Sequence, residues 1–227
     1  MRRLLTAAVP VAAVVGANLA FVLLGTSFDY PDVLTRDPTD VLRRFHADRA
    51  IAWEFALLTL SAALLAPASF VLTDDRAVRA TGTAAAVVQT LGLLRWPLLV
   101  PGLSPDDPAD VRTVEALNLW LGNVIGETGG YLLTAAWTVL VLRALEPGRV
   151  STVVGGLAAV GILAGVVGAG EVNFLGYVLW SLWLLALACS HRITAGRSRA
   201  SWRARDGACR AASPGRAARR PESAPGR

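Results

Sequence analysis

The sequence predicts an all-α, polytopic transmembrane helix bundle with six spans and a disordered, arginine-rich C-terminal tail. Two observations carry this prediction. First, 54% of the 227 residues are hydrophobic and the mean hydropathy is +0.49, which is more apolar surface than a soluble domain can bury. Second, the apolar residues fall into six segments, each close to the roughly 20 residues that a helix needs to cross a bilayer.

The six segments form a predicted transmembrane domain over residues 1–192, with spans at 4–26, 51–73, 77–101, 119–142, 150–170 and 172–190. The first segment follows Met1-Arg-Arg and could be read as a secretory signal peptide. Its apolar part is longer than the usual core of such a peptide, and no small-x-small site closes it. We therefore expect a retained first span.

Arginines between the spans predict the orientation, because short cytoplasmic loops are enriched in basic residues. Sixteen arginines lie on one side, including the ten after His191, against five on the other side, which are Arg36, Arg43, Arg44, Arg49 and Arg112. Both termini are therefore expected in the cytoplasm. All 22 basic residues are arginine, which is typical of a GC-rich, actinobacterium-like genome. We accordingly expect a multi-pass protein of the cytoplasmic membrane of a bacterium.

The two long outer loops share a helix-start pattern, Asp37-Pro-Thr-Asp-Val41 and Asp107-Pro-Ala-Asp-Val111. An N-capping Asp, a Pro at the first helical position and a second Asp in the first turn favour a helix that begins there. We expect each to open a short interfacial helix that leads into the following span. In the first, Val41 and Phe45 would share the apolar face.

The tail, residues 193–227, is rich in Arg, Ala, Ser, Pro and Gly and is predicted to be disordered. Two interpretations stay open for it. The arginines can attract anionic lipid headgroups, or they can serve only to fix the topology. The pI of about 10.2 does not indicate nucleic-acid binding, because the basic residues concentrate in the tail and no folded nucleic-acid module is recognisable.

Glu127 is the most informative residue, because it lies inside the apolar fourth segment. A charge at the centre of a membrane helix costs roughly 2.5–3.5 kcal/mol, so it usually faces protein or a wet cavity. By helical rise, Arg95 in the third span falls at a similar depth and is the expected partner. Glu54 and Asn18 belong to the same outer half of the membrane.

The fourth span carries two stripes at four-residue spacing. Asn123, Glu127 and Tyr131 form a polar stripe, and Gly122, Gly126 and Gly130 form an adjacent stripe of small residues. Glycine stripes permit close helix approach, and Asn or Tyr can hydrogen-bond across such a contact. We therefore predict that this helix is central in the bundle and that Arg95, Glu127, Glu54, Asn123, Tyr131 and Asn18 form one polar cluster.

Two hypotheses remain for this cluster. Arg95 and Glu127 can form a buried ion pair that keeps the helices in register. Alternatively, the charges line a small cavity that binds a polar ligand or carries a proton.

Motifs for catalysis, cofactors and metals are missing from the sequence. There is no G-x-S-x-G, H-E-x-x-H or C-x-x-C pattern, and no phosphate loop is possible without lysine. His46 and His191 flank opposite membrane faces, and Cys189 and Cys209 lack metal spacing. The expectation is no catalytic residue, no metal site and no cofactor.

The stretch Gln89-Thr-Leu-Gly-Leu-Leu-Arg-Trp-Pro97 and the block Leu121-Gly-Asn-Val-Ile-Gly-Glu-Thr-Gly-Gly-Tyr131, with Trp137 beyond, resemble a known group. They are similar to the bacterial multi-spanning membrane proteins of domain-of-unknown-function family 4386 (DUF4386). The resemblance covers the chain from the first span to about Ser190. It implies a membrane topology and no reaction or ligand.

The sequence thus predicts a non-enzymatic membrane protein that senses or scaffolds, with the lipid bilayer as its one certain partner. A small-molecule or proton-coupled transporter that uses Glu127 and Arg95 is the alternative. An intramembrane enzyme is a third hypothesis, and it is less favoured because the sequence offers no evident nucleophile with a general base.

Overall fold

The computed structural model describes residues 2–211, and side chains within residues 8–190. The chain divides into two compact units, Met1–Cys189 and Ser190–Arg227. The first unit contains the helical bundle. Side chains of the predicted tail, and all of residues 212–227, lie outside this description, so both interpretations of the tail stay predictions.

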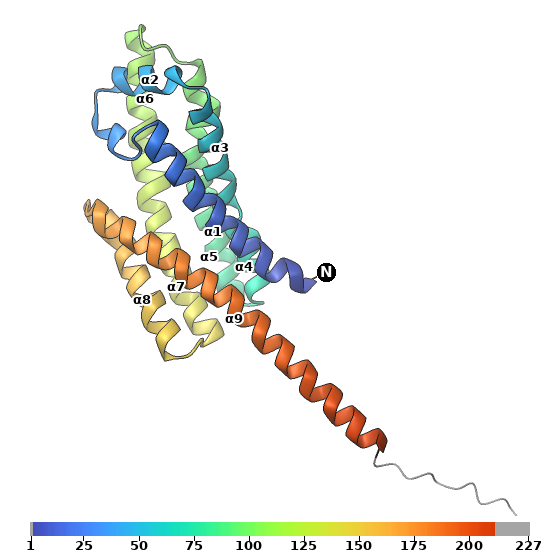
Figure 1. The fold of residues 1–227 in the computed structure, drawn as a ribbon. Coiled ribbons are helices and arrows are strands. Elements are labelled where there is room, and N and C mark those ends of the chain that lie inside the picture. Colours follow the sequence, from blue (N-terminus) through green and yellow to red (C-terminus); the bar gives the residue numbers. More distant parts are fainter. Residues whose placement is uncertain (1, 212–227) are drawn as a thin grey trace, which may run out of the picture. The chain divides into compact units, whose positions relative to one another are not determined.

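The described chain is helical throughout, with short connections (Figure 1). Six helical stretches are long and apolar enough to cross a membrane, at Ala8–Ser27, Ala50–Leu72, Arg76–Gly102, Pro108–Leu145, Arg149–Val167 and Gly170–Ser190. Only 28–44% of the apolar window in each is buried by the protein itself, so most of this surface needs a lipid environment. The predicted all-α fold with six candidate spans is confirmed, and the chain is a multi-pass membrane protein.

Most spans are built from more than one helical segment. The first is α1 (Arg2–Ser27) and the second joins α3 (Ala50–Ala63) to α4 (Leu65–Leu72). The remaining segments, in chain order, are α5 (Arg76–Leu94), η2 (Arg95–Leu99), η3 (Val100–Gly102), α6 (Pro108–Leu117), η4 (Asn118–Gly129), α7 (Gly130–Leu145), α8 (Arg149–Leu163), η5 (Ala164–Val167) and α9 (Gly170–Ala211).

One end of the bundle, which we call the capped end, carries α2 (Pro38–Ala47) and α6 (Figure 1). η1 (Asp32–Thr35) and α2 connect the first two spans, and α6 begins the fourth. The predicted helix starts are confirmed: the Asp37 carboxylate accepts the Thr39 N–H at 2.8 Å, and the Asp107 carboxylate accepts the Ala109 N–H at 2.8 Å. Val41 and Phe45 are buried, as the amphipathic pattern predicts.

The apolar core has two parts. The part at the capped end joins Phe28, Phe45 and Phe55 to Trp96, with the Phe55 and Trp96 rings stacked at 4.7 Å between centroids. The other part collects residues of α4, α5, α7 and α9 around Trp137 and Trp183. The capped-end part ties α2 and the segment after α1 to the ends of α3 and α5.

Glycine allows α5 and η4 to approach closely. A Cβ built on Gly92 would meet the Gly126 Cα at 2.6 Å, and one on Gly126 would meet the Gly92 Cα at 3.0 Å. Because both positions lack a side chain, the two backbones touch directly. The predicted packing role of the glycine stripe is confirmed at Gly126.

The third and fourth spans depart from regular α-helix at the level of the polar residues. Arg95–Leu99 (η2) and Asn118–Gly129 (η4) are π-helical, and α5 packs along η4. In η2 the Val100 N–H donates to the Arg95 carbonyl, five residues back. The predicted four-residue stripes rest on regular α-helix geometry, and these two segments have π-helical geometry instead.

Candidate functional site

Arg95 begins the π-helical segment η2 and is almost completely buried, with 3% of its surface exposed. Its Nε donates to the Asn118 side-chain oxygen at 3.0 Å, and its Nη1 donates to the Gly92 carbonyl. The guanidinium carbon also lies 5.2 Å from the Trp96 ring centroid. The buried cation is therefore held by uncharged partners.

Gly122 of η4 provides the space for this guanidinium. A Cβ at Gly122 would lie 2.7 Å from Arg95 Nη2 and 2.9 Å from Cζ. One glycine of the predicted stripe therefore accommodates an arginine side chain, while its neighbour Gly126 accommodates a helix backbone. The stripe serves two different packing purposes.

Glu127 lies in η4 and is half-buried. The Tyr131 hydroxyl, one turn further along the chain in α7, donates a hydrogen bond to its carboxylate. The Tyr131 and Tyr177 rings stand 6.0 Å apart, and the Tyr177 ring stands 6.4 Å from Trp180. The carboxylate thus lies beside a row of aromatic side chains that reaches from α7 to α9.

Arg95 and Glu127 are close enough to interact electrostatically, but they do not form a direct ion pair. The ion pairs within 4.0 Å among the described side chains are Arg36–Asp29, Arg43–Asp40 and Arg79–Asp74. The expected partnership of Arg95 and Glu127 is therefore one through space, and each residue has its own neutral hydrogen-bond partners.

Tyr30, in the segment after α1, joins this electrostatic group from the capped end. Burial raises the pKa of its hydroxyl to about 12; the nearby Glu127 carboxylate raises this pKa further, while Arg95 lowers it. Tyr30 is therefore a neutral hydroxyl at physiological pH. Its ring packs at 5.3 Å from Phe55 and 5.8 Å from Phe21, between α3 and α1.

Three predicted members of the cluster have other partners. Glu54 accepts a hydrogen bond from Ser27 Oγ at 2.5 Å. Asn18 is exposed and donates to the Val14 carbonyl at 2.8 Å and to Ser181 Oγ at 3.0 Å. Asn123 is exposed.

The structure adds partners that the sequence analysis missed. Asn118 accepts a hydrogen bond from Arg95, and Tyr177 and Tyr30 lie within electrostatic range of Glu127. Next to them, Gln89 Nε2 donates to Thr134 Oγ1 at 2.7 Å, which links α5 to α7. Tyr177 and Tyr30 come from distant parts of the chain, so no local sequence spacing could predict that they lie near Glu127. Asn118 could have been predicted as a site residue, because it is a polar residue at the start of an apolar run.

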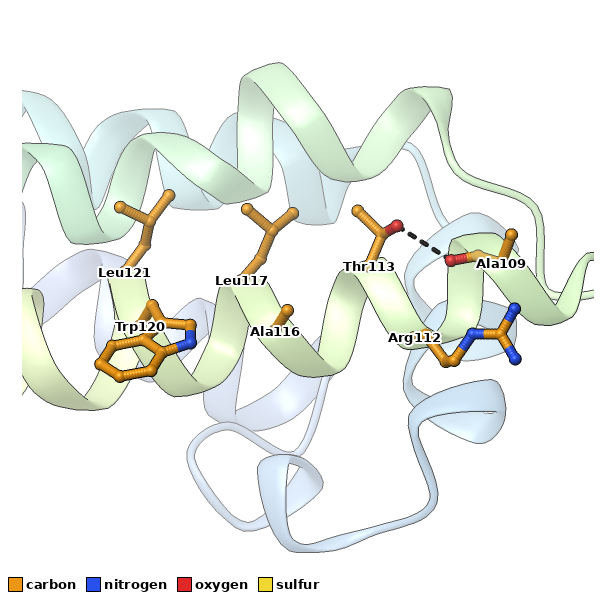
Figure 2. A pocket seen from close by; sticks show the side chains of 7 residues that line it. All are labelled: Ala109, Arg112, Thr113, Ala116, Leu117, Trp120 and Leu121. Atoms are coloured by element: carbon orange, nitrogen blue, oxygen red, sulfur yellow. Dashed lines mark hydrogen bonds between the residues drawn. The ribbon is translucent and has the colours of Figure 1, made fainter.

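Two surface hollows complete the description. A groove of about 940 Å³ lies between α3 and η2 at the capped end. A smaller one, about 450 Å³, is lined by α6 and the first turn of η4 alone (Figure 2). Its one drawn hydrogen bond, from Thr113 Oγ1 to the Ala109 carbonyl at 2.9 Å, stays within that helix, so this hollow is only one helix face.

Among the described residues, no group of three or more His, Cys, Asp or Glu side chains is placed to hold a metal ion. His46, at the capped end, is exposed, and its Nε2 lies 2.7 Å from the Leu103 carbonyl. Comparison with protein-family models, curated proteins and solved structures gives no match to the chain.

Proposed function

We propose that this membrane protein is a non-enzymatic sensor in which Arg95 has a structural role and Glu127 binds a small ligand. The observation that carries the proposal is the difference between the two charges. Arg95 is buried, and its Nε and Nη1 groups donate to Asn118 and to the Gly92 carbonyl. Glu127 is half-buried, and among the described residues its carboxylate has one hydrogen-bond partner, Tyr131.

The surroundings of Glu127 favour a small organic cation as the ligand. A carboxylate supplies the opposite charge, and the rings of Tyr131, Tyr177 and Trp180 supply faces that attract an ammonium group. Arg95 opposes a cation through space, but its guanidinium donates to Asn118 of η4 and to the Gly92 carbonyl of α5, and it is not in any ion pair among the described side chains.

A sensor also needs an element with two arrangements, and η4 fits this need. The twelve π-helical residues of η4 include three glycines and pack against α5. Single π-turns are common at functional sites, and a return to α-helix rotates every later side chain about the helix axis. A ligand on Glu127 can bias this equilibrium only if it binds the two arrangements differently.

The first experiment separates the two roles by thermal unfolding of the purified protein in detergent. Arg95→Ala leaves Asn118 and the Gly92 carbonyl without their donor, so we expect a loss of roughly 2–4 kcal/mol, seen as a clearly lower Tm. Glu127→Gln keeps the shape and a hydrogen-bonding amide, so its Tm should stay close to the parent value.

The second experiment tests ligand binding with choline, ethanolamine and tetramethylammonium as probes, and glycerol as the uncharged control. At least one cation should raise the Tm of the parent protein and fail to do so for Glu127→Gln. If Glu127→Gln lowers the Tm as strongly as Arg95→Ala, or no probe shifts the parent, the sensing role is wrong and the pair is structural.

A transporter is the second candidate, favoured by the helix breaks at Arg95–Gly102 and Asn118–Gly129. Broken membrane helices form substrate sites in many transporters. Uptake of a radiolabelled cation into proteoliposomes distinguishes the two: a transporter accumulates or exchanges it, and Glu127→Gln abolishes the flux. A sensor binds the cation without flux.

We further propose that the chain belongs to DUF4386 and lies in a bacterial cytoplasmic membrane with both termini in the cytoplasm. The motif around Arg95 and the Gly/Glu/Gly/Tyr block of the fourth span support the family, and the arginine distribution supports the orientation.

A further inference from the structure

The groove between α3 and η2 lies apart from the Arg95 and Glu127 sites and has a polar end and an apolar end. Its volume is about 940 Å³, within the range of small-molecule sites. His46, Asp48 and Arg49 line it at the capped end, and Thr59, Leu60 and Ala63 line it towards the middle of the second span.

Small residues and a proline create this hollow. Ala52, Ala56 and Ala63 lie on one face of α3 and form the bottom of the groove, where their small side chains leave space. The opposite wall belongs to the π-helical segment η2 and the residue before it, with Leu94, Pro97 and Leu98. Trp96 fills the other side of η2 by stacking on Phe55, so it does not occupy the groove.

The exposed apolar side chains of the groove require lipid around them. Trp53 is 78% exposed, Leu98 is 67% exposed and Leu60 is 61% exposed, although all three belong to candidate spans. Tryptophan is enriched where a membrane helix meets the headgroups. Trp53 one turn after Arg49 therefore places the polar end of the groove at the membrane–water interface.

Arg49 is the cation without a protein partner at this end, among the residues whose contacts the structure describes. The Asp48 carboxylate accepts the Ala50 N–H at 2.8 Å at the start of α3. His46 is engaged with the Leu103 carbonyl. The polar end therefore presents a free guanidinium beside a carboxylate that is already hydrogen-bonded.

We propose that this groove binds one anionic phospholipid, with an acyl chain along Ala52, Ala56 and Ala63 and the phosphate at Arg49. Arg49 and Ala63 lie 14 residues apart, which is about 21 Å along the helix. Half of a bilayer including its headgroups measures roughly 20–22 Å. A lipid of the leaflet at the capped end thus reaches from Arg49 to the membrane centre, and guanidinium–phosphate pairing selects an anionic headgroup.

The experiment measures lipid binding to the purified full-length protein by native mass spectrometry. Dioleoylphosphatidylglycerol is the anionic probe and dioleoylphosphatidylcholine the zwitterionic one. Arg49→Ala tests the headgroup contact and Ala56→Phe fills the floor of the groove. The matched controls are Arg44→Ala, an exposed arginine of α2 outside the groove, and Ala136→Phe, an exposed position of α7.

We expect one phosphatidylglycerol bound in preference to phosphatidylcholine. Arg49→Ala should weaken phosphatidylglycerol binding at least about tenfold with little effect on phosphatidylcholine. Ala56→Phe should remove the bound lipid of both kinds, and both controls should bind like the parent. Because Arg49 is exposed and outside the apolar window, its variant tests the proposal even if Ala56→Phe does not fold.

Three results would overturn the proposal. Equal losses in Arg44→Ala and Arg49→Ala would mean general attraction to a basic surface. Parent-like binding by Ala56→Phe would place the lipid elsewhere. A dimer in detergent or nanodiscs that Ala56→Phe dissociates, with no bound lipid, would make the groove a contact between two copies of the chain.

Discussion

At the scale of single residues, the two intramembrane charges have opposite environments. Arg95 donates hydrogen bonds to two uncharged acceptors, Asn118 and the Gly92 carbonyl, and packs against Trp96. Glu127 is half-buried and lies beside tyrosine rings. If Arg95 and Glu127 formed a buried ion pair in direct contact, both residues would be needed to stabilise the bundle. Their separate partners allow one residue to stabilise the bundle and the other to remain available.

Gly122→Ala tests how tightly η4 encloses Arg95. The added methyl group would lie 2.7 Å from Nη2, and the guanidinium cannot move without straining its bonds to Asn118 and Gly92. Overpacking of this kind costs about 1–3 kcal/mol, so we expect a lower Tm in detergent. Gly156→Ala is the matched control, because nothing lies within 4 Å of its added Cβ.

Gly156→Ala should leave the Tm unchanged or raise it slightly, since alanine favours helix over glycine. If both variants unfold at the parent temperature, the guanidinium has room to relax, and Gly122 is not required for the Arg95 site.

At the scale of elements, the sequence predicted the helix starts and spans well because their causes are local. An Asp-Pro-x-Asp pattern supplies its own cap, and an apolar run of sufficient length needs no distant partner. The π-helical segments could not be predicted in this way. Their hydrogen-bond register depends on how Gly92, Gly122 and Gly126 meet Arg95 and the neighbouring backbone, which is a tertiary contact.

The same reasoning explains the predicted site. Tyr131 lies near Glu127 because the two are four residues apart, so a local pattern sufficed. Asn123, also four residues from Glu127, is exposed, so four-residue spacing alone does not predict which of these side chains is buried. Glu54 accepts a hydrogen bond from Ser27 and Asn18 donates one to Ser181, so each has a partner on another helix. Membrane depth estimated from helical rise does not fix the direction of a side chain around its helix.

Asp107→Ala tests the cap of α6. The Asp107 carboxylate accepts the Ala109 N–H at 2.8 Å, and loss of such a cap costs about 1 kcal/mol. We expect faster hydrogen–deuterium exchange at the first turn of α6, with little change in the rest of the bundle. Asp106→Ala, one residue earlier, removes the same charge without removing the cap. Equal exchange in both variants would show that charge, not capping, stabilises this turn.

At the scale of the whole molecule, the bundle's two ends differ in kind. The capped end carries η1, α2 and α6 over an aromatic core, whereas the turns at the other end connect spans directly, as at Thr73–Asp75 and Glu146–Gly148. Counted along the sequence, sixteen arginines fall on the side of these short turns, including Arg76, Arg79, Arg143 and Arg149, and five fall on the side of the capped end. The positive-inside rule therefore predicts that the capped end faces away from the cytoplasm.

Cysteine labelling in intact cells tests this orientation, in a background of Cys189→Ser and Cys209→Ser. Ser104→Cys lies between η3 and α6 at the capped end, and Asp74→Cys lies between α4 and α5 at the other end of the same span. Asp74 is 97% exposed, and loss of its surface ion pair with Arg79 costs little. A membrane-impermeant maleimide should label Ser104→Cys directly and Asp74→Cys only after permeabilisation. The reverse pattern would invert the orientation, whereas labelling of both from outside would mean that Arg76–Gly102 does not cross the membrane.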